Sequence, residues 1–211
     1  MLKLWLKKYI ICYTNIFIAK IIQKVMKALF LDRDGVINVY KERITSPTQI
    51  ELVANSAEAI KLLNENNFKT IIITNQPQIA MGLCTIQDVE TIHSFLLQLL
   101  SERNARIDGL YYCPHKPNQK IPEYSIKCEC RKPKPGMILQ AQKDFKISDL
   151  SSCFMIGDTL ADIETGKNAG CKTILVKTGL GGEYSSDHII PNYITNDLYE
   201  AVTRIILKNY D

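Results

Sequence analysis

The sequence predicts an α/β fold built on a mostly parallel sheet with helices on both faces. Short apolar runs of strand length alternate with segments of helical periodicity from residue 26 to the end of the chain. Polar residues follow directly after several of these runs, at the sheet edge where parallel strands bind ligands. Hydrophobic residues make up 46% of the 211 residues and charged residues 23%, which is a globular composition. Together these observations indicate a Rossmann-like arrangement.

Strands are predicted where β-branched and other apolar residues form short runs. The first covers residues 28–31 and ends at Asp32, and the second covers residues 70–73 and ends at Thr74. Further strands are predicted at residues 107–112, 153–156 and 173–176, with a last short one near Ile194.

Helices are predicted between the strands from capping residues and apolar spacing. Asn55 or Ser56 can cap the first helix, and Thr85 with Asp88 resembles a capping box for a long second helix. Gly170 ends the helix that follows the fourth strand. Two further helices are expected to start at Pro135 and Gly136 and near residue 197.

Residues 1–25 are predicted to be separate from the domain that follows. They hold five lysines and no acidic residue, and residues 9–19 are mostly apolar. We expect Met26 to be the natural start, with a membrane anchor or a signal peptide as alternatives. Residues 26–211 are then expected to form a single domain. Its net charge is −1, against +4 for the whole chain, which argues against general binding of nucleic acid.

Three of the predicted strands end in residues that suit phosphate chemistry. Asp32 and Asp34 follow the first strand, Thr74 follows the second, and Asp158 follows the fourth. If these strands are neighbours, the three carboxylates converge on one small volume and would repel one another without a cation. Oxygen ligands suit Mg²⁺, which also accepts phosphate oxygens. The sequence therefore predicts a magnesium site at this edge of the sheet.

The same residue types suit transfer of a phosphoryl group. A carboxylate can attack phosphorus and form an aspartyl-phosphate, and a second acid two residues further on can point at the leaving oxygen. A threonine hydroxyl and backbone N–H groups can hold the phosphoryl oxygens, and a lysine can neutralise the developing charge. The order of all three motifs, each after its own apolar strand, is more specific than any one of them.

The segment from Phe30 to Asn38, which reads FLDRDGVIN, resembles motif I of the haloacid dehalogenase-like phosphatases. Thr74 matches their motif II, and Gly157-Asp158 with Asp162 matches their motif IV. The resemblance implies that Asp32 is the nucleophile and that Asp34 is the general acid and then the general base. It also implies that Mg²⁺ is held by Asp32, the backbone carbonyl of Asp34, and Asp158. No large cap domain is expected, because the stretch between the first two strands already contains a helix.

A loop of about residues 113–134 has the spacing of a zinc site. Cys113, His115, Cys128 and Cys130 read C-x-H-x₁₂-C-x-C. Three thiolates and one imidazole complete a tetrahedral Zn²⁺ with no open position, which is typical of a structural site. The loop has little apolar content of its own, so zinc would supply its order.

The zinc loop and the basic run after it narrow the resemblance to one branch. The phrases YYCPH and CRKP resemble two related families, the D-glycero-D-manno-heptose 1,7-bisphosphate 7-phosphatases and the histidinol-phosphate phosphatases. This resemblance implies that Lys132 stabilises the phosphoryl group. Candidate substrate-binding residues by position are Arg131, Asn75, Gln76, Tyr40, Arg43 and Thr159. The chain departs from the heptose enzymes at residues 40–43, at Pro77 and at Thr159, which leaves its substrate open.

We therefore expect a Mg²⁺-dependent phosphatase of a small phosphorylated sugar or polyol, acting through phospho-Asp32. Heptose bisphosphate, a precursor of nucleotide-activated heptose for lipopolysaccharide, is the first expected substrate, and histidinol phosphate the second. A zinc-dependent nucleic-acid module and a non-catalytic phosphosugar sensor are the competing classes. The odd number of cysteines and their cluster favour reduced thiols and a cytoplasmic location. We expect a monomer, with no membrane contact unless residues 1–25 are an anchor.

Overall fold

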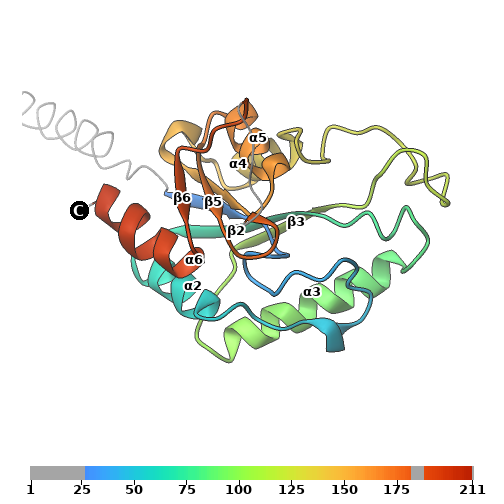
Figure 1. Ribbon diagram of the computed structural model, residues 1–211, viewed down its shortest axis with the longest axis horizontal. Coiled ribbons are helices and arrows are strands. Elements are labelled where there is room, and N and C mark those ends of the chain that lie inside the picture. Colours follow the sequence, from blue (N-terminus) through green and yellow to red (C-terminus); the bar gives the residue numbers. More distant parts are fainter. Residues whose placement is uncertain (1–26, 182–187, 211) are drawn as a thin grey trace, which may run out of the picture.

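The computed structural model describes residues 27–181 and 188–210. Within them, six parallel strands form one sheet in the order β3-β2-β1-β4-β5-β6 (Figure 1). The strands are β1 (Ala28–Leu31), β2 (Lys69–Asn75), β3 (Gly109–Cys113), β4 (Phe154–Gly157), β5 (Lys172–Val176) and β6 (Tyr193–Thr195). The predicted parallel α/β sheet is confirmed, and β1 lies between β2 and β4 as the convergence of the polar strand ends requires. The predictions about residues 1–25 lie outside the described residues.

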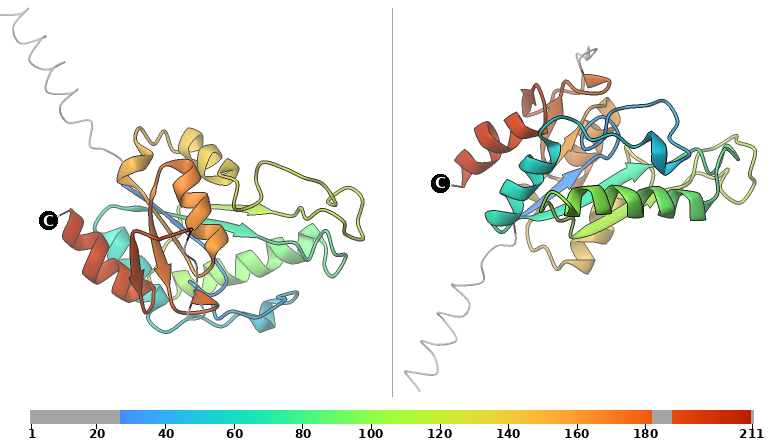
Figure 2. Two further views of the ribbon diagram at one scale, coloured as in Figure 1. Left: turned by 45° about the horizontal axis from the view of Figure 1, so that its top comes forward. Right: turned by 90° about the horizontal axis from the view of Figure 1, so that it is seen from below.

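Helices cover both faces of the sheet. On one face lie α2, α3 and α6, and on the other lie α4 and α5 (Figure 2). Their bounds are α2 (Ser56–Glu65), α3 (Ile86–Ser101), α4 (Gly136–Asp144), α5 (Leu160–Ala169) and α6 (Leu198–Glu200). The two longest connections among the described residues are residues 32–55, which include a 3₁₀ turn (Pro47–Gln49), and residues 114–135 between β3 and α4, and neither contains a further sheet or a long helix that would form a large cap over the sheet edge.

The strands alternate their side chains between two cores. Leu29 and Leu31 of β1 pack against the α2, α3 and α6 face, whereas Ala28 and Phe30 pack against α4. All four are at most 1% exposed, because a central parallel strand is buried on both faces. The continuous apolar run at residues 28–31 is the sequence signature of that position.

The helix caps agree closely with the sequence. Thr85 accepts from the backbone N–H of Asp88 at 3.1 Å and Asp88 accepts from that of Thr85 at 2.8 Å, which is the predicted capping box of α3. Gly170 ends α5 in the left-handed region at φ +82°. Asn55 precedes α2, but its side chain makes no capping hydrogen bond.

Three elements differ from the prediction. The second strand is longer than residues 70–73, because β2 runs from Lys69 to Asn75 and pairs with β3 as far as Cys113. The third strand begins at Gly109 rather than residue 107, because the Asp108 carboxylate accepts from the backbone N–H of Thr70 at 3.0 Å and from Lys69 at 2.7 Å. The last helix continues from α6 as a π-helix (Ala201–Ile206) and a 3₁₀ turn (Leu207–Asn209). Its wider turns keep Val202 and Ile206 fully buried in the same core as α2. No described helix is long and apolar enough for a membrane span.

Gly166 allows α5 to lie directly on the sheet. A Cβ atom at this position would be 2.6 Å from Thr173 Cγ2 and 2.7 Å from Met155 Cβ. We predict that Gly166→Ala destabilises the fold by about 1–3 kcal/mol, because this overpacking exceeds the gain of about 1 kcal/mol in helix propensity. Urea unfolding measures the change, with Lys167→Ala at an exposed position of α5 as the control. A more stable Gly166→Ala would contradict the close packing.

Candidate active site

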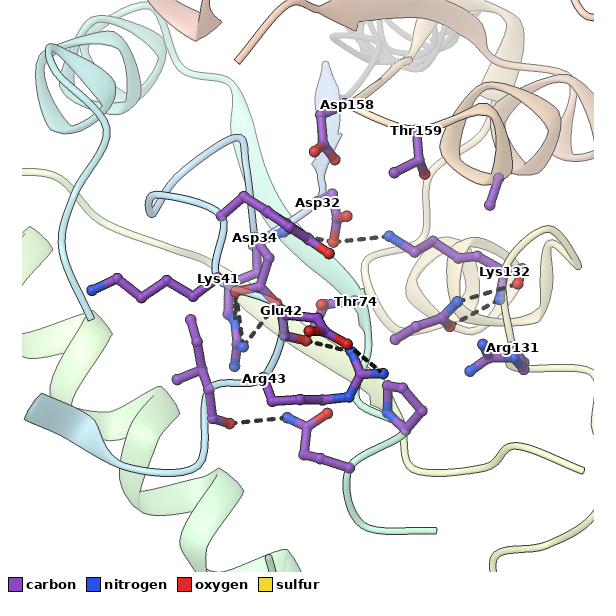
Figure 3. A pocket seen from close by; sticks show the side chains of 17 residues that line it. Asp32, Asp34, Lys41, Glu42, Arg43, Thr74, Arg131, Lys132, Asp158 and Thr159 are labelled. Atoms are coloured by element: carbon purple, nitrogen blue, oxygen red, sulfur yellow. Dashed lines mark hydrogen bonds and ion pairs between the residues drawn. The ribbon is translucent and has the colours of Figure 1, made fainter. Parts of the chain in front are cut away.

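A cavity of about 270 Å³ opens at the carboxyl ends of β1, β2 and β4 (Figure 3). Ten of the eleven residues predicted for catalysis, magnesium or substrate line it, and Gln76 is the exception. The ten are Asp32, Asp34, Tyr40, Arg43, Thr74, Asn75, Arg131, Lys132, Asp158 and Thr159. The walls come from the β1 end, the loop at residues 40–44, the β2 end, the zinc loop and the β4 end. A single sheet edge therefore gathers residues as far apart in the sequence as Asp32 and Thr159, which are 127 positions apart.

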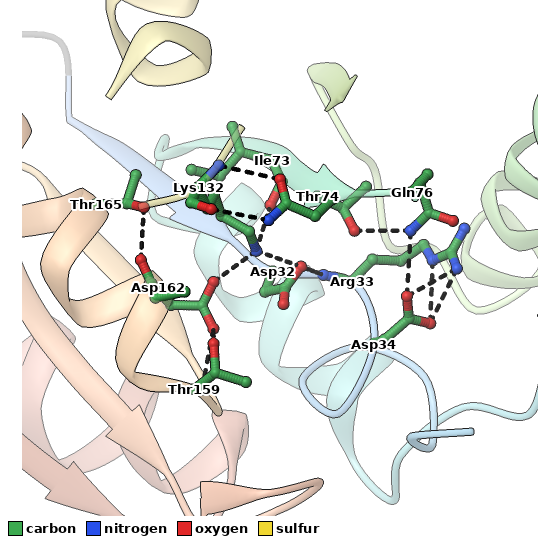
Figure 4. Close-up of polar contacts among 12 residues, drawn as sticks. Asp32, Arg33, Asp34, Ile73, Thr74, Gln76, Lys132, Thr159, Asp162 and Thr165 are labelled. Carbon is green, nitrogen blue, oxygen red and sulfur yellow. Dashed lines mark hydrogen bonds and ion pairs between the residues drawn. The ribbon is translucent and has the colours of Figure 1, made fainter. Parts of the chain in front are cut away.

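The Lys132 ammonium lies between two buried carboxylates (Figure 4). Its Nζ is 2.8 Å from Asp32 Oδ1 and 2.5 Å from Asp162 Oδ1, and it donates to the Ile73 carbonyl at 3.3 Å. The Lys132 side chain is only 3% exposed. Burial lowers the pKa of Lys132, but the charges of Asp162 and Asp32 and their hydrogen bonds outweigh it and raise the pKa above its ordinary value. Lys132 therefore carries its charge beside Asp32.

Asp32 is placed so that one of its oxygens is held and the other is free of protein donors. Oδ1 accepts from the backbone N–H of Arg33 at 2.7 Å and from Lys132 at 2.8 Å, whereas Oδ2 accepts nothing from the described residues. Burial raises the pKa of Asp32 to about 6, although Lys132 opposes the shift. The free oxygen is the one that can react with an incoming group.

Asp158 lies in a tight backbone cradle beside Asp32. Its Oδ2 accepts from the backbone N–H of Leu180 at 2.9 Å. A Cβ on Gly35 or Gly179 would be 2.2 Å or 2.1 Å from this oxygen, and both glycines have positive φ. Burial, followed by the charges of Asp32 and Asp162, raises the pKa of Asp158 to about 8. Two buried carboxylates that repel each other fit a divalent cation, because a cation removes the repulsion.

The third carboxylate of this cluster is Asp162 rather than Asp34. Ligand atoms of Asp32, Asp158 and Asp162 all lie within 4.8 Å of one another. Asp162 is already occupied, because Oδ1 pairs with Lys132 and Oδ2 accepts from the Thr159 backbone at 3.0 Å and its hydroxyl at 2.6 Å. Asp162 thus caps α5 and anchors Lys132, which leaves Asp32 and Asp158 for a metal.

The Asp34 carboxylate turns toward a buried arginine. Arg33 donates to it from Nη2 at 2.8 and 3.0 Å and from Nε at 3.2 Å, and Asn38 and Gln76 donate at 2.9 and 3.2 Å. Burial alone would raise the pKa of Asp34, but the Arg33 charge and these hydrogen bonds outweigh it and lower the pKa. Asp34 is therefore ionised in this arrangement, with 21% of its side chain open to solvent.

Two polar residues at the end of β2, Asn75 within the strand and Gln76 directly after it, support other groups of the site. Gln76 is 1% exposed, and its amide donates to Thr74 Oγ1 at 2.9 Å and to Asp34 at 3.2 Å. Because Thr74 Oγ1 accepts this bond, its own hydrogen is free to point into the cavity. Asn75 donates to the Lys132 carbonyl at 3.2 Å and accepts from the Lys132 backbone N–H at 3.0 Å. Both amides are thus engaged within the protein.

Sequence reasoning missed Arg33, Asn38 and Gln78 as parts of the site. Gln78 donates to Gln76 Oε1 and to the Ile44 carbonyl, so it joins the β2 end to the loop at residues 40–44. Arg33 is 1% exposed although it lies between two acidic residues. An arginine between two aspartates predicts a charged pair, but only the fold shows that the pair is buried.

The four predicted zinc ligands form a compact tetrahedral cluster. Cys113 Sγ is 3.5 Å from Cys128 Sγ, and Cys130 Sγ is 3.1 and 3.2 Å from those two atoms. His115 Nδ1 is 3.3 Å from Cys130 Sγ and 3.7 Å from Cys113 Sγ. A zinc ion with Zn–S bonds of about 2.3 Å gives S···S edges of roughly 3.8 Å, so the three sulfur atoms lie slightly closer together than they would around zinc. Three thiols and one imidazole are the donor types that zinc prefers, and in this respect the set fits zinc. Hydrogen bonds from Cys113, then from Cys128 and His115, lower the pKa of Cys130 to about 5 despite burial.

Comparisons with known proteins agree with this geometry. A family model described as HAD-hydrolase-like matches residues 129–201. The D-glycero-D-manno-heptose-1,7-bisphosphate 7-phosphatase of Chlorobaculum tepidum is 44% identical over 188 residues, which cover 86% of this chain and 94% of the relative. The chain belongs to the heptose bisphosphate phosphatase family. The predicted resemblance is confirmed, and the chain is a phosphatase, an enzyme that hydrolyses phosphate monoesters.

Further relatives extend the agreement. The D-glycero-beta-D-manno-heptose-1,7-bisphosphate 7-phosphatase of Escherichia coli K12 is 37% identical over 158 residues, which cover 74% of this chain and 82% of the relative. A crystal structure of D,D-heptose 1,7-bisphosphate phosphatase from B. bronchiseptica, complexed with magnesium and phosphate, matches with a TM-score of 0.77 and 28% identity. The match covers 87% of this chain and 99% of that one. Family membership and this structure support Mg²⁺ as the cofactor.

Removal of Asp162 tests the buried ion pair. We predict that Asp162→Ala destabilises the fold by about 3–5 kcal/mol, because it deprives Lys132 of a partner and α5 of its cap. Asp88 occupies the same capping position in α3 but is exposed, so Asp88→Ala should cost much less. Urea unfolding of both variants measures the difference. Equal losses would show that Asp162 acts only as a cap.

Proposed function

We propose that the protein removes the 7-phosphate of D-glycero-D-manno-heptose 1,7-bisphosphate through a phospho-Asp32 intermediate. The observation that carries the proposal is the Oδ2 of Asp32, which has no donor among the described residues and lies beside the charged Lys132 in the lining of the cavity. The likeness to heptose bisphosphate phosphatases over nearly their whole length supports the substrate. The absence of a disulfide among the cysteines of the described residues supports a cytoplasmic setting.

The first step forms a bond between Asp32 Oδ2 and phosphorus and breaks the bond to the sugar oxygen. Lys132 and the Thr74 hydroxyl face the phosphoryl oxygens and offset their negative charge. Magnesium, held by Asp32, Asp158 and the Asp34 carbonyl, would shield the charge between the attacking carboxylate and the phosphate. The leaving sugar oxygen takes its proton from Asp34, which must therefore carry that proton when the substrate is bound.

The second step returns Asp32 to its starting state. Asp34, now ionised, takes a proton from a water molecule, and the resulting hydroxide attacks phosphorus and releases Asp32. The contacts of Asp34 with Arg33, Asn38 and Gln76 stabilise this ionised form. They favour the second step, and at least one of them is weakened in the protonated form that Asp34 has before it donates its proton to the leaving oxygen in the first step.

The charge of the cavity rim favours a bisphosphate over histidinol phosphate. Lys41, Arg43 and Arg131 line the cavity at its rim, where Glu42 is the one acidic residue beside them among the described lining residues; the other acidic lining residues are Asp32, Asp34 and Asp158. Histidinol phosphate carries an ammonium group, which these cations would repel. A second phosphate group on the substrate would instead be attracted. The positive charge of the rim is the observation that favours the bisphosphate over histidinol phosphate.

Side-by-side kinetics test the proposed function. We predict a kcat/KM for heptose 1,7-bisphosphate about 100-fold or more above that for histidinol phosphate, because like-charge contacts cost several kcal/mol.

Asp32→Asn should reduce turnover of either ester by on the order of 10⁴-fold without unfolding the chain. Magnesium removal by chelation should abolish turnover, and added Mg²⁺ should restore it. A higher kcat/KM for histidinol phosphate would show that histidinol phosphate, and not the heptose bisphosphate, is the substrate. An Asp32→Asn variant that keeps its turnover would contradict the phospho-Asp32 mechanism.

We further propose that zinc occupies the Cys113, His115, Cys128 and Cys130 cluster and orders the loop that carries Arg131 and Lys132. The Arg131 guanidinium donates to the His115 carbonyl at 3.0 Å, so the loop and the rim are directly linked. A closed set of four protein ligands leaves no position for a reacting water, which supports a structural role.

Metal analysis tests the zinc proposal. We predict about one zinc per chain in the purified protein, and loss of zinc with a lower melting temperature in Cys128→Ser. Cys84 lies outside the cluster and is half-buried, so Cys84→Ser is a matched control that keeps its zinc. A Cys128→Ser variant with the zinc content of the parent would contradict the assignment.

A further inference from the structure

The cations of the cavity divide into two groups. Lys132 is neutralised by Asp32 and Asp162, and Arg33 is neutralised by Asp34. Both side chains are at most 3% exposed and have a carboxylate partner, so neither belongs to the solvent-facing rim, although Arg33 Nη1 is buried without a hydrogen-bond partner. Lys41, Arg43 and Arg131 form the second group, at the rim, and none of them has a buried acidic partner.

Arg43 is set on a rigid part of the rim. Its carbonyl accepts from Gln49 Nε2 at 3.3 Å, and the next carbonyl, of Ile44, accepts from Gln78 Nε2 at 3.3 Å. The Ile44 side chain is 2% exposed and packs in the main core. Gln49 also accepts from Thr45 N–H at 2.8 Å. The backbone beneath Arg43 is thus fixed on both sides, which suits preorganised binding.

Among residues 27–181 and 188–210, the guanidinium of Arg43 has one competing partner, its neighbour Glu42. It donates to the Glu42 carbonyl at 2.5 Å and lies 3.4 Å from Glu42 Oε1. The Glu42 side chain is 80% exposed, and an ion pair in such a position is weak. A dianionic ligand can therefore displace Glu42 from Arg43 at small cost.

Two of the other rim groups, Lys41 and Thr159, are less available than Arg43. Lys41 donates to the Gln49 carbonyl at 2.7 Å and pairs with Glu51 at 3.8 Å. Thr159 is uncharged, and its hydroxyl donates to Asp162 at 2.6 Å. Arg131 keeps part of its guanidinium free on the zinc loop, where it lines the same cavity as Arg43 (Figure 3).

We propose that Arg43 binds the non-reacting phosphate of the substrate and makes the enzyme selective for bisphosphates over monophosphates. The inference rests on the proposed function and assigns one residue of the rim to the second phosphate. A planar guanidinium can donate two parallel N–H bonds to a phosphate, so it supplies both charge and orientation. Glu42 opposes this binding, because its carboxylate repels the phosphate and competes for Arg43.

The test measures kcat/KM for heptose 1,7-bisphosphate and for heptose 7-phosphate, and the readout is their ratio. Arg43→Ala should lower the ratio by about 10- to 100-fold, mainly through the KM of the bisphosphate, because a charged hydrogen-bonded contact is lost. Arg43→Lys should lower it less, since it keeps the charge but not the paired N–H groups. Glu42→Gln should raise the ratio, which is a change in the opposite direction at the adjacent residue.

Arg106 is the matched control. It is a 64% exposed arginine far from the cavity lining, so Arg106→Ala should keep the parent ratio. An Arg43→Ala ratio within about twofold of the parent would overturn the inference, as would equal losses on both substrates with a lower melting temperature. A parent enzyme that fails to hydrolyse the bisphosphate but hydrolyses another phosphate ester would overturn the proposed function instead. The two failures are thus distinguishable.

Discussion

The buried ammonium of Lys132 is the interaction on which the rest of the site depends. It joins the β1 end through Asp32, the β2 end through the Ile73 carbonyl and α5 through Asp162. An unpaired charge at this depth would be costly, so the two carboxylates and the carbonyl are needed together. Asn75 holds the Lys132 backbone from β2, and the Cys/His cluster lies in the loop that leads directly to Lys132. The position of Asp32 therefore depends on four separate segments of the chain.

The sheet and the loops have different tasks in this architecture. Strand ends β1, β2 and β4 bring together Asp32, Thr74 and Asp158, whose positions are fixed by the parallel register. The loop at residues 40–44 and the loop between β3 and α4 supply the charged rim. Because the described residues include no large cap, substrate specificity is expected to depend on these loops. The strand ends can therefore keep the same reaction while changes in the two loops alter which substrate is bound.

The sequence predicted most of the fold and the residues of the site, but not the hydrogen-bond partners of individual polar groups. The apolar run at residues 28–31, the capping box of α3 and the Cys/His spacing are local patterns, and each agrees with the structure. Gln76, expected to contact phosphate, instead supports Thr74 and Asp34, and it does not line the cavity. Short-range patterns cannot reveal such contacts, because the partner is chosen by packing between distant segments.

By itself, the sequence determined the parallel α/β class, the acidic strand ends and the ligand set of the Cys/His cluster. These follow from periodicity and spacing along a single segment, which neighbouring residues control. Only the tertiary structure decided that Asp162, and not Asp34, completes the carboxylate cluster around Lys132. It also decided that Arg33 is buried against Asp34 whereas Arg43 stays at the rim. Burial and charge pairing depend on which segments meet at the sheet edge, and that is a property of the whole fold.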